Sequence, residues 1–213
     1  MKNYKVTCIL LVVFFFTFDF MVAQDTNSAV KLKNEFLVST SSLTLSNFSL
    51  KYYRSINQKL WYKLALINLS GSYHKTEPSS SSIAIYPTRD FYYSSGVAAG
   101  LEKRNYITDK FEMVIGLDLQ MTYIYKNHFT DNPNILQELR DNKDITFTPG
   151  IGFVIGGYYH AGEHFSFGVE INPQVYYYYE KYNNANNTVH YKETGFNYSF
   201  SSNNASIGLK YVW

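Results

Sequence analysis

The stretch Phe111 to Lys126, FEMVIGLDLQMTYIYK, decides the fold that the sequence predicts. Its residues alternate between two sets. The first set is apolar or aromatic and comprises Phe111, Met113, Ile115, Leu117, Leu119, Met121, Tyr123 and Tyr125. The second is mostly polar or small and comprises Glu112, Val114, Gly116, Asp118, Gln120, Thr122, Ile124 and Lys126. Because successive side chains of a β-strand point to opposite faces, the stretch predicts a strand with one apolar and one polar face.

The predicted strand is longer than the roughly 5–6 residues of an ordinary globular strand. A strand that crosses an outer membrane needs about 9–11 residues, and aromatic residues flank its apolar band. Phe111 at one end and Tyr123 and Tyr125 at the other fit this plan. The stretch therefore predicts one strand of a small outer-membrane β-barrel.

The composition agrees with a single membrane-embedded β domain. Charged residues make up 17% of the 213 residues, below the roughly 25% typical of soluble domains. The chain has 21 Tyr and 16 Phe, and its formal net charge is only +2. So small a net charge gives no reason to expect a nucleic-acid partner.

The first residues predict a signal peptide, residues 1–23. Lys2 and Lys5 form a basic start, Ile9 to Phe16 is an unbroken apolar run, and cleavage would follow Ala23. An uncleaved anchor helix is the alternative, but the apolar run is shorter than the roughly 20 residues that a spanning helix needs. Residues 24–213 are then a single outer-membrane β-barrel domain.

The whole chain predicts an all-β fold, an eight-stranded antiparallel up-and-down transmembrane barrel. Long polar loops, residues 75–90, 127–144 and 183–194, alternate with short turns, as in outer-membrane barrels. We expect bulges near Ser46-Asn47, at Pro173 and at Asn203-Asn204, and a helix-like piece over Ile135 to Arg140. The expected strands are Glu35–Thr40, Leu43–Arg54, Lys59–His74, Phe91–Ile107, Phe111–Lys126, Ile145–His160, Phe165–Tyr182 and Gly195–Trp213.

The last segment carries a recognisable signal. Apolar and aromatic residues stand at every second position, at Ile207, Leu209, Tyr211 and the terminal Trp213. This segment resembles the C-terminal assembly signal of Gram-negative outer-membrane proteins, and the mature chain resembles the small barrels of the OmpX type and the OmpA membrane domain. The resemblance implies an outer-membrane location, contact with membrane lipids and insertion by the barrel-assembly machinery. It implies no activity, because a fold does not determine a function.

The alternation also predicts which residues face lipid and which face the interior. The interior of an eight-stranded barrel is just wide enough for side chains to fill. We therefore expect paired charges to plug it, in an ion-pair network around Arg104 with Glu102, Glu112, Asp118 and Glu170 as candidate partners. The expected interior charges are Lys51, Lys63, Glu102, Arg104, Glu112, Asp118, Lys126 and Glu170. The expected lipid-facing residues include Phe111, Met113, Ile115, Leu117, Leu119, Met121, Phe153, Ile155, Val169 and Ile171.

Candidate chemistry is confined to the long-loop ends. His74, His128 and His190, with Ser79 to Ser82, could serve an acyl hydrolase or acyltransferase, or the three His could hold a metal. No spacing motif fixes their geometry, so the sequence predicts no catalytic residue, no metal site and no cofactor.

We therefore expect a structural or interaction barrel whose loops contact an extracellular or envelope protein partner. Three alternatives remain open: an outer-membrane lipid-modifying enzyme, a component of a secretion apparatus as in PorT-like barrels, and a soluble lipocalin-like ligand carrier. The last would place the apolar face of Phe111 to Lys126 inside the barrel.

Overall fold

The computed structural model describes residues 33–41, 47–77, 86–184, 189–200 and 204–213. All of them belong to one compact unit, Leu32–Trp213. The predicted signal peptide and its cleavage site lie outside the described residues.

Strands make up nearly all of this unit. They are β1 (Asn34–Thr40), β2 (Phe48–Ser55), β3 (Leu60–Thr76), β4 (Thr88–Thr108), β5 (Phe111–Thr130), β6 (Asp141–His160), β7 (Phe165–Ile171), β8 (Gln174–Asn183), β9 (Val189–Ser199) and β10 (Ala205–Val212). One short 3₁₀ helix, η1 (Gln137–Leu139), lies in the turn between β5 and β6.

Eight of the strands close into a ring in the order β1-β2-β3-β4-β5-β6-β7-β10. Every pairing is antiparallel, and β10 closes the ring by pairing with β1, where Phe36 lies opposite Tyr211. Closure leaves no unpaired strand edge in this part of the molecule. The predicted eight-stranded antiparallel up-and-down barrel is confirmed.

Pro173 divides one predicted strand into two. The lower part of β6, Ile155–His160, pairs with β7, whereas its upper part, Lys143–Gly152, pairs with β8. Proline has no N–H to donate to a sheet, although the Pro173 carbonyl still accepts a bond from the amide of Phe153 at 2.9 Å. The predicted bulge at Pro173 is therefore wrong, because the strand breaks there.

The last predicted strand is divided in the same way, into β9 and β10. Asn204 lies at this second break and bridges it to the first. Its backbone carbonyl accepts from the Asn172 amide at 2.7 Å, and its Nδ2 donates to the Asn172 carbonyl at 2.9 Å. In place of the predicted bulge the strand is divided, since β9 ends at Ser199 and β10 begins at Ala205. Asn203 and Ser46, which belong to the two predicted bulges, lie outside the described residues.

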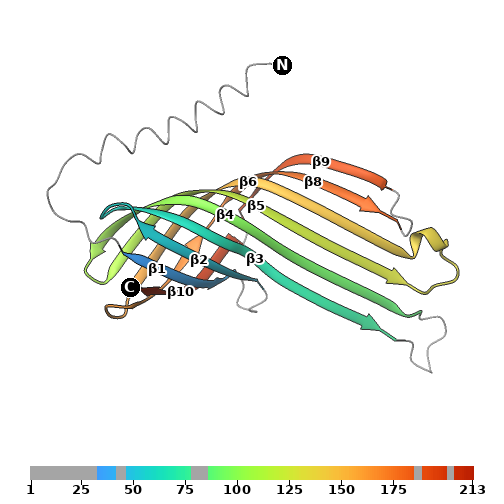
Figure 1. Cartoon of the computed structure of the whole chain (residues 1–213), viewed down its shortest axis with the longest axis horizontal. Helices are drawn as coiled ribbons and strands as arrows, with labels where there is room; N and C mark the ends of the chain where they lie inside the picture. Colours follow the sequence, from blue (N-terminus) through green and yellow to red (C-terminus); the bar gives the residue numbers. More distant parts are fainter. Residues whose placement is uncertain (1–32, 42–46, 78–85, 185–188, 201–203) are drawn as a thin grey trace, which may run out of the picture. The chain divides into compact units, whose positions relative to one another are not determined.

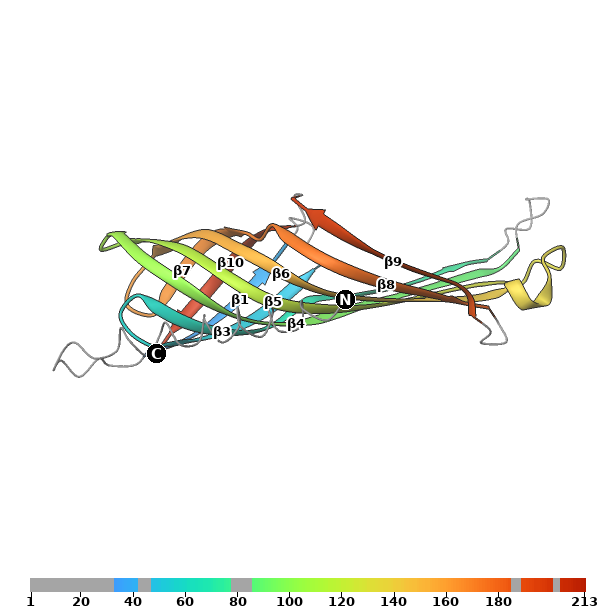
Figure 2. The same ribbon diagram turned by 90° about the horizontal axis from the view of Figure 1, so that it is seen from above.

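Six strands continue beyond the ring as one sheet, in the order β3-β4-β5-β6-β8-β9. In Figure 1, β3 to β6 run on well past the short strands β1, β2 and β10, with β8 and β9 beside β6. Figure 2 shows the same arrangement from above, with the ring at one end. We call this part the projecting sheet: Ser70–Thr76 of β3, Thr88–Ser94 of β4, Ile124–Thr130 of β5, Asp141–Thr146 of β6, and β8 with β9.

The projecting sheet corrects the predicted loops. Described parts of all three predicted loops are strand: β3 reaches Thr76, β4 begins at Thr88, β5 reaches Thr130, β6 begins at Asp141 and β9 begins at Val189. A sheet that is solvated on both faces does not need apolar residues at every second position. Its strands are therefore polar throughout, and their sequence resembles that of a loop. The predicted helix-like piece over Ile135 to Arg140 is reduced to the 3₁₀ turn η1.

Asn68 marks the level at which β3 leaves the ring. The pairing of β3 with β4 shifts between Ile67 and Ser70, and Asn68 has a φ of 55°. Asparagine tolerates this left-handed conformation better than most residues. Its Nδ2 donates to Thr122 Oγ1 at 3.1 Å, which ties the irregular segment to β5.

The ring has its apolar side chains outside. Leu119 is 58% exposed and Ile115 is 50% exposed, whereas Val114 on the opposite face of β5 is fully buried. The predicted lipid-facing residues lie on this outer face, among them Phe153, Val169 and Ile171. The soluble-carrier alternative is overturned, because it requires these side chains inside.

We expect Leu119→Arg to lower the free energy of unfolding by about 2–4 kcal/mol, because a guanidinium would face acyl chains near the middle of the membrane. Urea unfolding in liposomes, followed by circular dichroism, measures the change. Tyr73→Arg is the matched control: Tyr73 is 63% exposed on the projecting sheet, and its substitution should cost about 0–1 kcal/mol. Equal costs for the two variants would contradict the assigned facing.

Candidate functional site

Nine charged side chains of the described strands lie inside the ring. They come from strands all around it and are all buried: the carboxylates Glu35, Glu102, Glu112, Asp118 and Glu170, and the cations Lys51, Lys63, Arg104 and Lys210. An unpaired charge in such surroundings costs several kcal/mol, so their mutual positions decide whether the interior is stable.

Arg104 on β4 is the centre of one cluster. Its Nη1 lies 2.6 Å from Glu35 Oε2 of β1, and its other nitrogens lie 3.5 Å from Glu102 and from Glu112. Lys210 of β10 reaches the same carboxylates, at 3.3 Å from Glu35 and 3.2 Å from Glu112. The two cations therefore share two carboxylates across the ring.

Aromatic rings surround these cations. The Arg104 guanidinium lies 3.9 Å from the centroid of Trp61 and 4.9 Å from that of Tyr53, and Lys210 Nζ lies 3.7 Å from the centroid of Tyr158. A cation over an aromatic face is attracted by the ring quadrupole, and more strongly where water is excluded. The rings thus stabilise charge that the carboxylates alone would have to balance.

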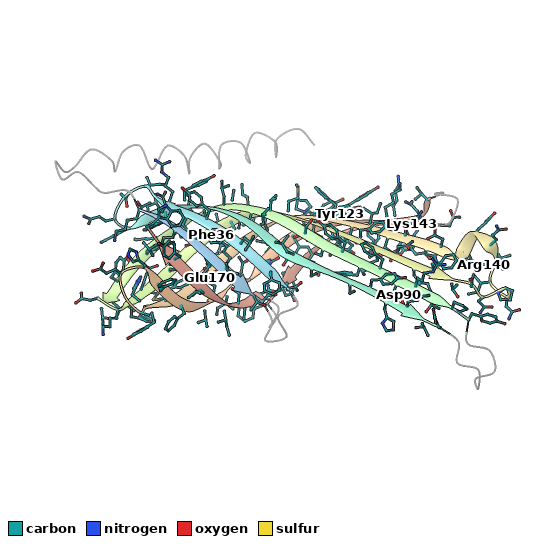
Figure 3. All side chains as sticks on the ribbon, turned by 60° about the horizontal axis from the view of Figure 1, so that its bottom comes forward. Phe36, Asp90, Tyr123, Arg140, Lys143 and Glu170 are labelled. Atoms are coloured by element: carbon teal, nitrogen blue, oxygen red, sulfur yellow. The ribbon has the colours of Figure 1, made fainter. Side chains whose placement is uncertain are left out.

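A second cluster lies next to the first and is linked to it by Glu102. Lys63 Nζ lies 3.1 Å from Glu102 and 2.6 Å from Asp118. Lys51 pairs with Glu170, which also accepts from Tyr158 Oη and, at 3.3 Å, from Tyr53 Oη. Glu170 is labelled inside the ring in Figure 3.

These contacts correct two predicted partners of Arg104. Asp118 and Glu170 pair with lysines instead, and Glu35 takes the place predicted for them. The strand register explains the difference, since Asp118 lies opposite Gly100 and that glycine lies opposite Lys63. Glu102 and Glu112 do contact Arg104, at 3.5 Å each.

Lys126 is also misplaced by the prediction. Its place in the alternation, in the same set as Glu112 and Asp118, predicts that it faces the interior. It lies instead on the projecting sheet above the ring and is exposed. Its cross-strand neighbour on β6 is Asp144. Burial raises the pKa of Asp144, and the Lys126 ammonium partly offsets this rise.

Two interior charges, Glu35 and Lys210, were missed. Glu35 belongs to the short β1, where alternation is hard to detect, and Lys210 lies inside the terminal segment that was interpreted only as an assembly signal. The alternation of Lys210 with Leu209 and Tyr211 could have revealed its inward position. Trp61 of β3 also lies inside the ring, where it is 3% exposed against the Arg104 guanidinium.

His160 joins the interior from the short-turn end. Its Nε2 lies 3.3 Å from Glu112 Oε2, and its Nδ1 lies 2.8 Å from Ser166 Oγ.

Gly100 makes room for the second cluster. A Cβ at this position would lie 2.0 Å from Asp118 Oδ1 and 2.4 Å from the Leu117 carbonyl. Any larger residue would therefore push Asp118 away from Lys63. The glycine is required here by close approach of the neighbouring strand.

A small polar cavity of about 50 Å³ lies above the second cluster. Hydroxyl and amide side chains line it, including Ser39, Asn68, Gln120, Asn172 and Ser206. Its volume accommodates water rather than a larger ligand.

The sequence-selected histidines lie away from the interior. His74 on β3 and His128 on β5 are on the projecting sheet, whereas Ser79 to Ser82 and the side chain of His190 lie outside the described residues. Within the described ranges, no three His, Cys, Asp or Glu side chains stand close enough in their present rotamers to hold a metal ion. None of the described segments is a helix long and apolar enough to span a membrane.

We expect Arg104→Met to lower the free energy of unfolding by about 3–5 kcal/mol, because it leaves buried carboxylates uncompensated. Denaturant unfolding followed by circular dichroism tests this. Arg104→Met combined with Glu35→Gln should recover part of the loss. Lys75→Met is the control: its partner Glu77 lies at an exposed site, and its removal should leave the midpoint unchanged. A stable Arg104→Met protein would show that the interior charges do not depend on one another.

Comparison with known proteins supports the architecture. No family model matches the sequence, and no curated protein matches it. Among solved structures, a major outer membrane protein from Thermus thermophilus is similar, with a TM-score of 0.55 and 6% identity, over 85% of this chain and 99% of that one. The attachment invasion locus protein Ail of Yersinia pestis aligns with a TM-score of 0.36 and 12% identity, over 85% of this chain and 95% of that one. The similarity to the Thermus protein shows that the chain has the fold of the outer-membrane β-barrel proteins.

Proposed function

We propose that this chain is an outer-membrane protein that presents its projecting sheet to an extracellular or envelope protein, on a barrel whose interior is closed by ion pairs. The barrel serves as an anchor in this account. The observation that carries the proposal is the projecting sheet, which has two open edges where the ring below has none.

The outer surface supports the anchoring role. Apolar side chains such as Ile115, Leu119 and Phe153 are about half exposed on the ring. In water such an apolar surface would promote aggregation, whereas in a membrane the acyl chains solvate it. The terminal strand β10 carries the pattern of the assembly signal and closes the ring, which supports insertion by the barrel-assembly machinery.

The interior supports a closed rather than a conducting barrel. Eight strands leave room only for side chains, and Arg104, Lys63 and Lys210 each contact carboxylates from other strands. A permeating solute would have to displace several of these pairs at once. We propose that the network stabilises the barrel and carries no transport.

The open edges support the interaction role. In the described part of the chain β9 pairs only with β8, and β3 above Leu69 pairs only with β4. An unpaired strand edge offers its N–H and C=O groups to an added strand. Phe196 and Tyr198 on β9 are 82% and 85% exposed, so an added strand would find aromatic side chains beside the free backbone groups.

The β8–β9 hairpin is built to keep this edge extended. Tyr182 and Tyr191 stack at 5.2 Å between centroids, Tyr177 meets Phe196 edge-on at 5.2 Å, and Tyr178 Oη donates to Glu193 at 2.7 Å. Cross-strand pairs of this kind each contribute up to about 1 kcal/mol. The edge is therefore presented in a fixed conformation, which favours binding over the mobility of an enzyme's loop.

A phage-displayed library of extended peptides, selected against the full mature protein in lipid nanodiscs, tests the proposal. We expect enriched peptides to alternate in polarity, and we expect Tyr198→Lys to reduce their binding about tenfold or more, since edge lysines oppose strand addition. Tyr93→Lys is the control, because Tyr93 is 43% exposed on the inner strand β4, outside the β8–β9 hairpin, and it should retain binding. No enrichment, or equal binding by both variants, would contradict the interaction role.

A further inference from the structure

Three neighbouring strands of the projecting sheet place metal-binding side chains in one row. His74 of β3 lies opposite Asp90 of β4, and Asp90 lies opposite His128 of β5. Residues directly opposite one another share a face of the sheet, so all three side chains project from the same face. Asp90 is labelled on the projecting sheet in Figure 3.

The spacing of this row suits a single cation above Asp90. Adjacent strands are about 4.7–4.9 Å apart, so the two histidines are separated by roughly twice that distance with the carboxylate between them. Imidazole nitrogens bind Zn²⁺ at about 2.0–2.1 Å and carboxylate oxygens at about 2.0–2.2 Å. Two rings inclined towards the middle strand can therefore share an ion with the shorter aspartate.

Half of the arrangement is already in place. His128 Nδ1 lies 2.5 Å from Asp90 Oδ1, and both side chains are 51% exposed. His74 is exposed on the edge strand, where rotation about its side-chain bonds takes only picoseconds to nanoseconds. Turning that ring towards Asp90 completes the three-ligand set.

A fourth residue can orient His128. Asn142 of β6 lies opposite His128 on the other side. Its Nδ2 donates to the Leu139 carbonyl at 3.0 Å, whereas its Oδ1 is buried and has no hydrogen-bond partner in the described structure. Metal-bound histidines almost always donate their second ring N–H to an oxygen, and this amide oxygen is suited to accept it.

We propose that His74, Asp90 and His128 form a binding site for a divalent first-row transition cation such as Zn²⁺, which fastens the open edge strand β3 to β4 and β5. Two histidines and one carboxylate suit zinc and leave a coordination position open to water or to a side chain of a bound protein. The site does not depend on the proposed interaction role.

Zinc titration of the full mature protein, purified without a histidine tag in detergent micelles, tests the proposal by isothermal calorimetry. We expect one Zn²⁺ per chain, and we expect His74→Ala, His128→Ala and Asp90→Asn each to weaken binding by about tenfold or more. His164→Ala is the matched control, because His164 is exposed at the short-turn end beside the Val212 carbonyl. It should bind zinc as the parent does.

Two further readouts separate loss of the site from loss of the fold. Heat-modifiable migration on gels should be unchanged in every variant, and Co²⁺ should give visible d–d absorption with the parent but not with His128→Ala. Zinc should also slow amide exchange in Ser70–Thr76 of β3. Absence of stoichiometric binding, or equal binding by the parent and both histidine variants, would overturn the proposal. The peptide selection is repeated in EDTA, which removes divalent cations. Peptide binding that persists there tests the interaction role independently of the metal site.

Discussion

The need to pair buried charges inside a closed ring is the constraint on which the rest of this structure depends. Lipid on the outside requires apolar side chains there, so the polar residues of each alternating strand are forced inwards. Eight strands leave no room for bulk water to solvate them. The ionised groups must then pair with one another, and Arg104 and Lys210 do this by sharing Glu35 and Glu112.

This constraint also accounts for the uncharged residues of the interior. Tyr53, Trp61 and Tyr158 place π faces against cations, so that neither cation depends on carboxylates alone. Gly100 removes a side chain where Asp118 has to reach Lys63. In the interior, cations thus pack against aromatic rings and carboxylates, and a glycine leaves the space that one ion pair needs.

Much of the barrel could be predicted from alternation, because the period of two is a local property of each strand. Alternation correctly separated Ile115 and Leu119 from Glu112 and Asp118. The partners of Arg104 could not be predicted, because Glu35 is 69 residues away in sequence and meets it only when the ring closes with a particular register.

The misplacement of Lys126 has a similar origin: alternation continues along β5 beyond the level where the short strands β1 and β2 stop. The outer ends of the strands in the projecting sheet, such as 127–130 of β5 and 189–194 of β9, were missed because a sheet wet on both faces leaves no hydrophobic pattern.

The closed ring and the open projecting sheet are subject to different physical constraints. Below Asn68 the sheet is closed and must pair its buried charges, whereas above it the sheet is open and solvated, so unpaired edges and exposed histidines are tolerated. The same four strands, β3 to β6, belong to both parts, which ties whatever binds above to a rigid anchor below.

Nitroxide spin labels at Leu119 and Gln120, measured in liposomes, test the inside-out arrangement most directly, because these neighbours point to opposite faces of β5. The account predicts that the label at 119 collides with oxygen dissolved in acyl chains, whereas the label at 120 is shielded from lipid. A label at 120 in contact with acyl chains, with position 119 shielded, would contradict it.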